Sequence, residues 1–151
     1  MSWAKMIVGW GQDAAVQKLS VEAKLLFVLG FTHSGDASLI GLSRVGYSKM
    51  TAWLGAGEPA GVEIVERSLD ELAVKPLALY DFDHQLLWIV NRVKHINTTE
   101  AWAEGAARAL SYMPPSPLVD AWRDMYGGAL PTRERTRPRT HLNKGAVAVI
   151  R

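Results

Sequence analysis

The chain has 151 residues and a mass of 16.6 kDa, the size of one domain with or without an appendage. Hydrophobic residues make up 48% and charged residues 21%, a globular balance that argues against a wholly disordered chain. The absence of cysteine excludes disulfides, thiolate metal sites and a cysteine nucleophile. No long apolar segment follows the N-terminus, and apolar stretches such as 25–29 are too short to cross a bilayer. We therefore expect a cytoplasmic protein that does not enter a membrane.

Charge is distributed unevenly along the chain. Residues 131–151 hold six Lys and Arg side chains against Glu134 alone, a net charge of +5. Residues 1–130 hold 11 basic and 14 acidic side chains, a net charge of −3. The overall charge of +2 therefore comes from the C-terminal tail, and any attraction to nucleic acid is expected to depend on it.

The first long helix is predicted to follow a capping serine. Before it, residues 6–10 predict a strand or an extended arm, and 13–18 predict one or two helical turns. Ser20 is the expected N-cap of a helix over 21–31. This helix is apolar over most of its circumference, as is typical of a central helix. Its expected core stripe consists of Val21, Leu25, Val28 and Leu29, widened by Leu26 and Phe27.

A short strand and two helices are predicted next. Leu39 and Ile40 form the candidate strand, and Ser43 is the expected cap of a second helix over 44–54. After a Gly- and Pro-containing turn, a third helix is predicted over 60–72. Its apolar residues show the clearest helical period in the chain, and they are Val62, Val65, Leu69 and Leu72.

The period then changes to that of strands. The runs 76–80 and 86–90 are typical of strands, and the polar link 81–85 has the length of a hairpin connection. Asp81 and Asp83 lie just before His84 in this link, and their charges oppose a role for its tip in binding DNA.

Two further helices are predicted after the hairpin. Thr98 or Thr99 is the expected cap of a helix that reaches about Met113. Ser116 followed by proline is typical of a helix start, and this last helix is expected to end near Tyr126. The tryptophans expected in the core are Trp88, Trp102 and Trp122.

The predicted order of helix, short strand, helix, helix and hairpin is that of a winged helix-turn-helix. We therefore predict a mainly α fold with a small β-hairpin. A winged-helix domain over 1–95 is followed by a C-terminal helical pair over 96–128 and a flexible basic tail over 129–151. Winged helices serve as DNA readers and as protein adapters, so this order leaves both functions open.

Three segments resemble a known protein family. The segment 18–26, with Leu19-Ser20 before Glu22-Ala23, resembles the opening of phage replisome-organiser and DnaD-like replication-initiation proteins. The segment 86–95 resembles the end of their wing, where a tryptophan strand runs into a basic link, and 111–126 resembles phage members of the group. The resemblance covers roughly residues 5–126 and rests on short, mostly structural motifs. It implies a winged-helix domain that binds origin DNA or recruits replisome proteins.

The third helix departs from the pattern of a DNA-reading helix. Over 58–72 it carries five acidic side chains against Arg67, a net charge of −4 that phosphates would repel. Three interpretations stay open: a solvated face, a surface for a basic protein partner and, least favoured, insertion into the major groove. If DNA is bound, we expect the second helix, the wing and the tail to make most contacts.

Candidate nucleic-acid-binding residues are basic or hydroxyl side chains that can reach phosphates. The alternative at each position is an ordinary solvated surface. The tail arginines alternate with other residues, which would place all four on one side of an extended chain. The candidates are Arg44, Tyr47, Ser48 and Lys49 in the second helix, Lys75, Arg92 and Lys94 beside the wing, and Arg133, Arg135, Arg137 and Arg139 in the tail.

Catalytic sequence patterns are absent. The four histidines lie far apart in the sequence, and neither a phosphate-binding glycine loop nor a nucleophile elbow occurs. We therefore predict a protein that is not an enzyme and needs no cofactor or metal. The first hypothesis is a DNA-binding protein of phage replication-initiation type. The alternatives are a transcriptional regulator and a protein adapter that uses the acidic third helix or an N-terminal arm with Trp3 and Trp10; self-association stays open.

Overall fold

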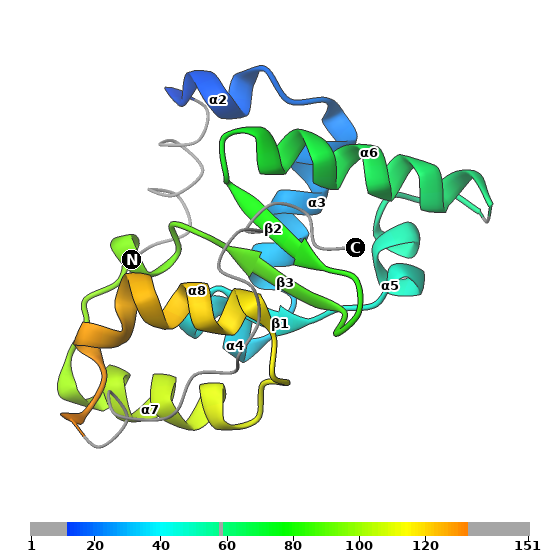
Figure 1. The fold of residues 1–151 in the computed structure, drawn as a ribbon. Coiled ribbons are helices and arrows are strands. Elements are labelled where there is room, and N and C mark those ends of the chain that lie inside the picture. Colours follow the sequence, from blue (N-terminus) through cyan, green and yellow to red (C-terminus); the bar gives the residue numbers. More distant parts are fainter. Residues whose placement is uncertain (1–11, 58, 133–151) are drawn as a thin grey trace.

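The computed structural model of the chain describes residues 12–57 and 59–132. The described chain is mainly helical with one small antiparallel sheet, as the sequence predicts (Figure 1). The elements before the hairpin are α2 (Ala14–Gln17), α3 (Val21–Thr32), α4 (Gly35–Ile40), β1 (Leu42–Arg44), α5 (Tyr47–Trp53) and α6 (Ala60–Val74).

The hairpin and the C-terminal helices complete the described chain. These elements are β2 (Ala78–Asp81), β3 (Leu86–Ile89), the 3-10 helix η1 (Val93–His95), α7 (Glu100–Ser111), α8 (Pro117–Tyr126) and the 3-10 helix η2 (Gly127–Ala129). The predicted hairpin and both predicted C-terminal helices are therefore confirmed, with small changes at their ends.

β3 is the central strand of the sheet. The strand order is β1-β3-β2, and both pairings are antiparallel. Trp88 of β3 lies between Leu42 of β1 and Leu79 of β2. All residues of β2 and β3 are buried, which explains why their sequences are nearly continuous apolar runs rather than alternating ones.

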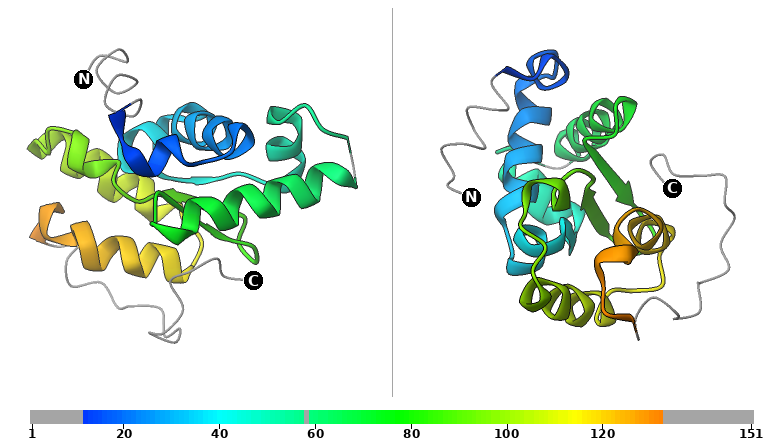
Figure 2. Two further views of the ribbon diagram at one scale, coloured as in Figure 1. Left: turned by 90° about the horizontal axis from the view of Figure 1, so that it is seen from above. Right: turned by 90° about the vertical axis from the view of Figure 1, so that its left-hand side faces the viewer.

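Helices cover both faces of the sheet. Helices α3, α5 and α6 lie on one side of the sheet, and α7 and α8 lie on the other side (Figures 1 and 2). Alternate residues of β3 enter different cores: Leu87 and Ile89 pack with α3 and α6, whereas Leu86 and Trp88 pack with α7 and α8. One strand thus joins two hydrophobic cores.

Two buried indoles attach the C-terminal helices to the end of α4. The indole N–H of Trp102 donates to the Leu39 carbonyl at 3.0 Å, and that of Trp122 donates to the Ile40 carbonyl at 2.8 Å. The two rings stack with centroids 6.5 Å apart. Trp88, Trp102 and Trp122 are all buried, so the predicted core role of these tryptophans is confirmed.

Side-chain caps begin three of the predicted helices, α3, α7 and α8. Ser20 accepts a hydrogen bond from the Ala23 amide, Thr99 from that of Trp102, and Ser116 from that of Leu118. Each cap satisfies an amide that has no partner within its helix. Short polar residues at these positions therefore fixed three helix starts correctly.

The predicted core stripe of α3 is wrong at Val21 and Leu25, whereas Leu26 and Phe27 are buried as predicted. Val21 is 75% exposed and Leu25 is 39% exposed, whereas the buried residues are Ala23, Leu26, Phe27, Gly30 and Phe31. The helix is apolar nearly all round, so periodicity could not choose its inner face. The face of α3 that packs inward is the one at which the helix approaches the sheet closely, since a Cβ on Gly30 would lie 2.5 Å from Leu87 Cδ2.

The predictions around residues 39–54 also need correction. Leu39 and Ile40 belong to a helix, because Ser34 caps α4 and Gly41 ends it with a left-handed φ of 76°. The strand follows as β1, and Ser43 lies buried in it opposite Leu87 instead of capping a helix. The second helix is shorter than predicted and begins after Gly46.

We expect Leu69→Ala to destabilise the protein by about 2–5 kcal/mol, because it opens a cavity between α6 and the sheet. Leu69 is 1% exposed and belongs to the core that α3 shares with β3. Val74→Ala, at an 82% exposed position of the same helix, should change the stability by less than about 0.5 kcal/mol. Urea unfolding measures both, and a cost for Leu69→Ala below about 1 kcal/mol would contradict this packing.

Candidate nucleic-acid interface

Three of the candidate side chains are exposed along the junction of β1 and α5. Arg44 ends β1, and Ser48 and Lys49 lie in the first turns of α5. The Lys49 ammonium lies 5.9 Å from the ring centroid of Trp53, one turn along α5. This junction therefore presents two cationic side chains and one hydroxyl to solvent.

Tyr47 is engaged within the protein. Its hydroxyl donates to Glu66 Oε1 at 3.3 Å, and its ring lies 6.0 Å from that of Tyr80 and 5.5 Å from that of Phe82. Tyr80 in turn donates to the Val45 carbonyl at 2.7 Å. These contacts fix the start of α5 against α6 and the hairpin, which makes Tyr47 a positioning residue for this junction.

The exposed face of α6 is acidic in the structure as in the sequence. Between Ala60 and Val74 the helix carries four carboxylates and one guanidinium, a net charge of −3. Glu63, Arg67 and Asp70 are exposed, while Val65 and Leu69 point into the core. A phosphate backbone laid along this face would meet mostly like charge.

The hairpin tip is tied to the start of α8 through a buried carboxylate. Asp81 Oδ2 accepts from His84 Nδ1 at 2.7 Å and from Ser116 Oγ at 2.5 Å, while Oδ1 accepts from the amides of Asp83 and His84. The turn closes with Gln85 at a left-handed φ of 51°. The hairpin tip is therefore held by Asp81, and the His84 ring faces a carboxylate.

Three candidates beside the hairpin have different surroundings. Lys75, the C-cap of α6, and Lys94 in η1 are exposed. Arg92 is partly buried: its Nε donates to the Ser38 carbonyl at 2.6 Å, and its guanidinium lies 4.4 Å from the ring centroid of Phe31. Burial lowers the pKa of Arg92 below its ordinary value. Its contacts make it a bridge between α3, α4 and the segment after β3.

The remaining candidates lie outside the described residues. They are the tail residues Arg133, Arg135, Arg137 and Arg139, and the N-terminal Trp3 and Trp10. The candidates are thus not gathered into one patch by the described part of the chain: Arg44, Ser48 and Lys49 lie together, and Lys75, Arg92 and Lys94 lie on later segments.

The described residues hold no cluster of three or more His, Asp or Glu side chains that would suit a metal ion. Within the same ranges, no helix combines the length and apolarity that a membrane span needs. Comparisons with protein families, with curated proteins and with solved structures found no match to this chain.

Two features were missed by reasoning from the sequence. The first is the Asp81 cluster, because a polar link between strands gives no sign that one carboxylate is buried beneath a distant helix. The second is a groove between α2 and the end of α6, which contains Val74. The sequence feature that could have indicated the groove is Val74, an apolar residue outside the stripe formed by Val65, Leu69 and Leu72.

We expect Asp81→Asn to destabilise the protein at pH 7 by on the order of 1–3 kcal/mol, as for a buried charged hydrogen-bond acceptor. Burial alone would raise the pKa of Asp81, but hydrogen bonds from Ser116 and His84 outweigh burial and hold the pKa below 3.8. The ionised carboxylate therefore stabilises the fold above pH 3.8, and this contribution is lost as the pH falls through the lower pKa of the folded state.

Urea unfolding at pH 7 and at about pH 3 tests this dependence. The difference between wild type and Asp81→Asn should narrow at the lower pH. Asp83→Asn, an exposed neighbour in the same turn, should stay within about 0.5 kcal/mol of wild type at pH 7. An equal Asp81→Asn effect at both pH values would show that its charge is not the stabilising feature.

Proposed function

We propose that the chain is a winged-helix protein that binds duplex DNA during replication initiation. The observation that carries the proposal is the order α3, α4, β1, α5, α6, β2, β3, which is a winged-helix order with α4 added before β1, together with the strand order β1-β3-β2. In this interpretation α5 and α6 form the helix-turn-helix, and β2 and β3 form the wing. The replication role rests on the resemblance of segments 18–26, 86–95 and 111–126 to phage replisome-organiser and DnaD-like proteins.

The charges favour contact through α5 rather than α6. Arg44, Ser48 and Lys49 are exposed at the start of the helix-turn-helix, where they can donate to phosphate oxygens. The α6 face carries a net charge of −3 and is therefore unsuited to the major groove. The tail, with a net charge of +5 over 131–151, supplies the attraction that the rest of the chain lacks.

A second candidate function is that of a protein adapter on the same fold. The acidic face of α6 favours it, together with large apolar side chains that stay exposed, including Val21 and Val74. If the chain is an adapter, the basic junction of β1 and α5 and the tail do not bind DNA. A measurement of DNA binding therefore distinguishes the two candidate functions.

We expect removal of the junction cations to weaken DNA binding and its dependence on salt. Each lost phosphate contact flattens the slope of log K against log salt by about 0.9 on duplex DNA, so Arg44→Ala with Lys49→Ala should flatten it by about 1.8. Arg108→Ala removes an exposed cation from α7, on the other side of the sheet, and should leave the slope unchanged. Fluorescence anisotropy with a labelled duplex measures both variants, and an unchanged slope in the double variant would remove α5 from the interface.

We expect the tail to contribute more to the salt dependence of DNA binding than Arg44 and Lys49 do. A chain ending at residue 130 lacks the four alternating arginines, so its salt slope should be flatter than that of the full chain by about 3–4. The same titration measures this. If the full chain binds no DNA at low salt, the DNA-binding function is wrong and the adapter function takes its place.

A further inference from the structure

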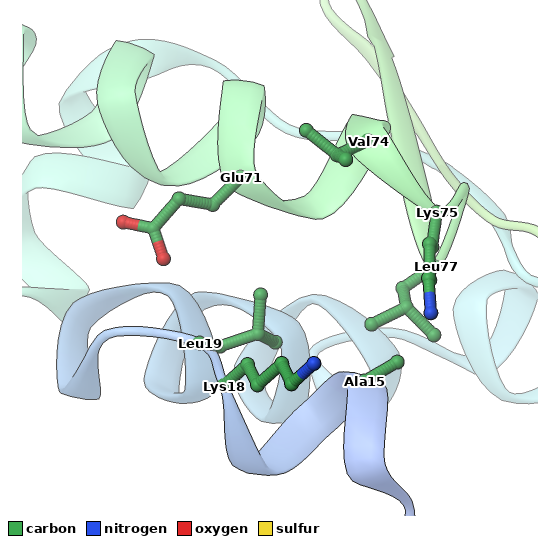
Figure 3. Close-up of a pocket in the computed structure, with 7 residues that line it drawn as sticks. All are labelled: Ala15, Lys18, Leu19, Glu71, Val74, Lys75 and Leu77. Atoms are coloured by element: carbon green, nitrogen blue, oxygen red, sulfur yellow. The ribbon is translucent and has the colours of Figure 1, made fainter.

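An open groove lies between α2 and the C-terminal end of α6 (Figure 3). Its volume is about 230 Å³. The side chains that line it come from α2 and the turn after it, and from the end of α6 and the turn into β2. They are Ala15, Lys18, Leu19, Glu71, Val74, Lys75 and Leu77.

The groove has an apolar surface that the chain leaves partly uncovered. Leu19 and Leu77 are partly buried and pack against the core that α3 and α6 share. Val74 is 82% exposed, the most exposed large apolar side chain in the described part of the protein. Covering these three side chains would remove apolar area from water, which favours association with a partner that carries apolar side chains.

The charges around the groove are separated. The Glu71 carboxylate lies toward one end and the ammonium groups of Lys18 and Lys75 toward the other (Figure 3). Glu71 Oε2 already accepts from the Ser20 amide at 2.8 Å. Within the described ranges, neither ammonium group makes a hydrogen bond or an ion pair. The groove therefore offers an apolar surface beside two cations that are open to carboxylates.

We propose that this groove docks a short acidic segment of a partner protein. One apolar side chain of the segment rests on Leu19, Val74 and Leu77, and flanking Asp or Glu side chains face Lys18 and Lys75. The size of the groove favours a peptide, because sites for small molecules usually measure about 300–1,000 Å³. Grooves between helices commonly receive an apolar anchor from a partner segment in this way. This docking does not depend on DNA binding, and it assigns Lys75, one of the candidate nucleic-acid-binding residues, to a peptide instead.

The surroundings favour a peptide over DNA as the occupant. A duplex that approached Lys75 along α6 would also meet the carboxylates of this helix, Asp70 among them. A short peptide reaches the two lysines without lying along that face. A nucleic acid also presents no side chain to cover Val74.

Amide shifts of the isotope-labelled full chain test the proposal. The probes are two pools of short synthetic peptides with one Leu, Phe or Trp between Asp and Glu residues, or between Lys and Arg residues. The acidic pool should shift the amides of residues 15–19 and those of Val74, Lys75 and Leu77 at millimolar concentration, and the basic pool should not. Val74→Asp, and separately Lys18→Glu with Lys75→Glu, should each weaken binding at least about tenfold.

Two control variants separate the groove from general surface effects. Tyr112→Asp changes a 75% exposed side chain after α7, and Arg108→Glu reverses an exposed charge on α7; both should leave peptide binding unchanged. The proposal is wrong if the acidic pool gives no shifts, if both pools bind equally, or if Val74→Asp has no effect. It is also wrong if duplex DNA shifts these amides and the acidic peptides do not. Val74→Asp should not alter the DNA salt slope, so failure here leaves the DNA-binding function standing.

Discussion

Burial of β3 on both faces is the constraint on which the rest of the fold depends. Its odd and even residues enter two different cores, so a layer of helices is needed on each side of a sheet of three short strands. Trp88 illustrates this, since only the α7 and α8 side can cover an indole that faces away from α3 and α6. The C-terminal helical pair is therefore part of the same folded unit as the sheet, because its loss would expose one entire face of β3.

A second constraint is the hydrogen bond between Ser116 and Asp81, which links the C-terminal helical pair to the hairpin. Ser116 Oγ accepts from the Leu118 amide at the start of α8 and also donates to Asp81 at the end of β2. One hydroxyl thus links a helix cap to a buried carboxylate, and the same carboxylate holds the turn that carries His84. A hairpin tip fixed in this way does not extend freely toward a ligand, which is why the proposed DNA contacts are assigned to α5 and the tail.

The sequence predicted the elements whose pattern is local. Ser20, Ser116 and the pair Thr98 and Thr99, of which Thr99 is the cap, marked three helix starts. The predicted stripe of α6 is buried at Val65, Leu69 and Leu72, while its first member, Val62, is partly exposed. The inner face of α3 was not predictable, because apolar side chains surround it and the close approach at Gly30 depends on Leu87, far along the chain. The Asp81 cluster and the groove were not predictable for the same reason: each joins segments whose proximity is created only by folding.

The distribution of charge gives the two proposed surfaces different requirements. Residues 1–130 carry a net charge of −3, and α6 alone carries −3 within its bounds, so this part of the chain has no long-range attraction to a polyanion. The proposed DNA binding through Arg44 and Lys49 would therefore depend on the tail to attract the DNA. The proposed docking in the groove would not need the tail, because Lys18 and Lys75 would attract the carboxylates of a bound segment at short range. High salt should consequently weaken DNA binding far more than peptide docking, in which apolar contact contributes alongside the two lysines.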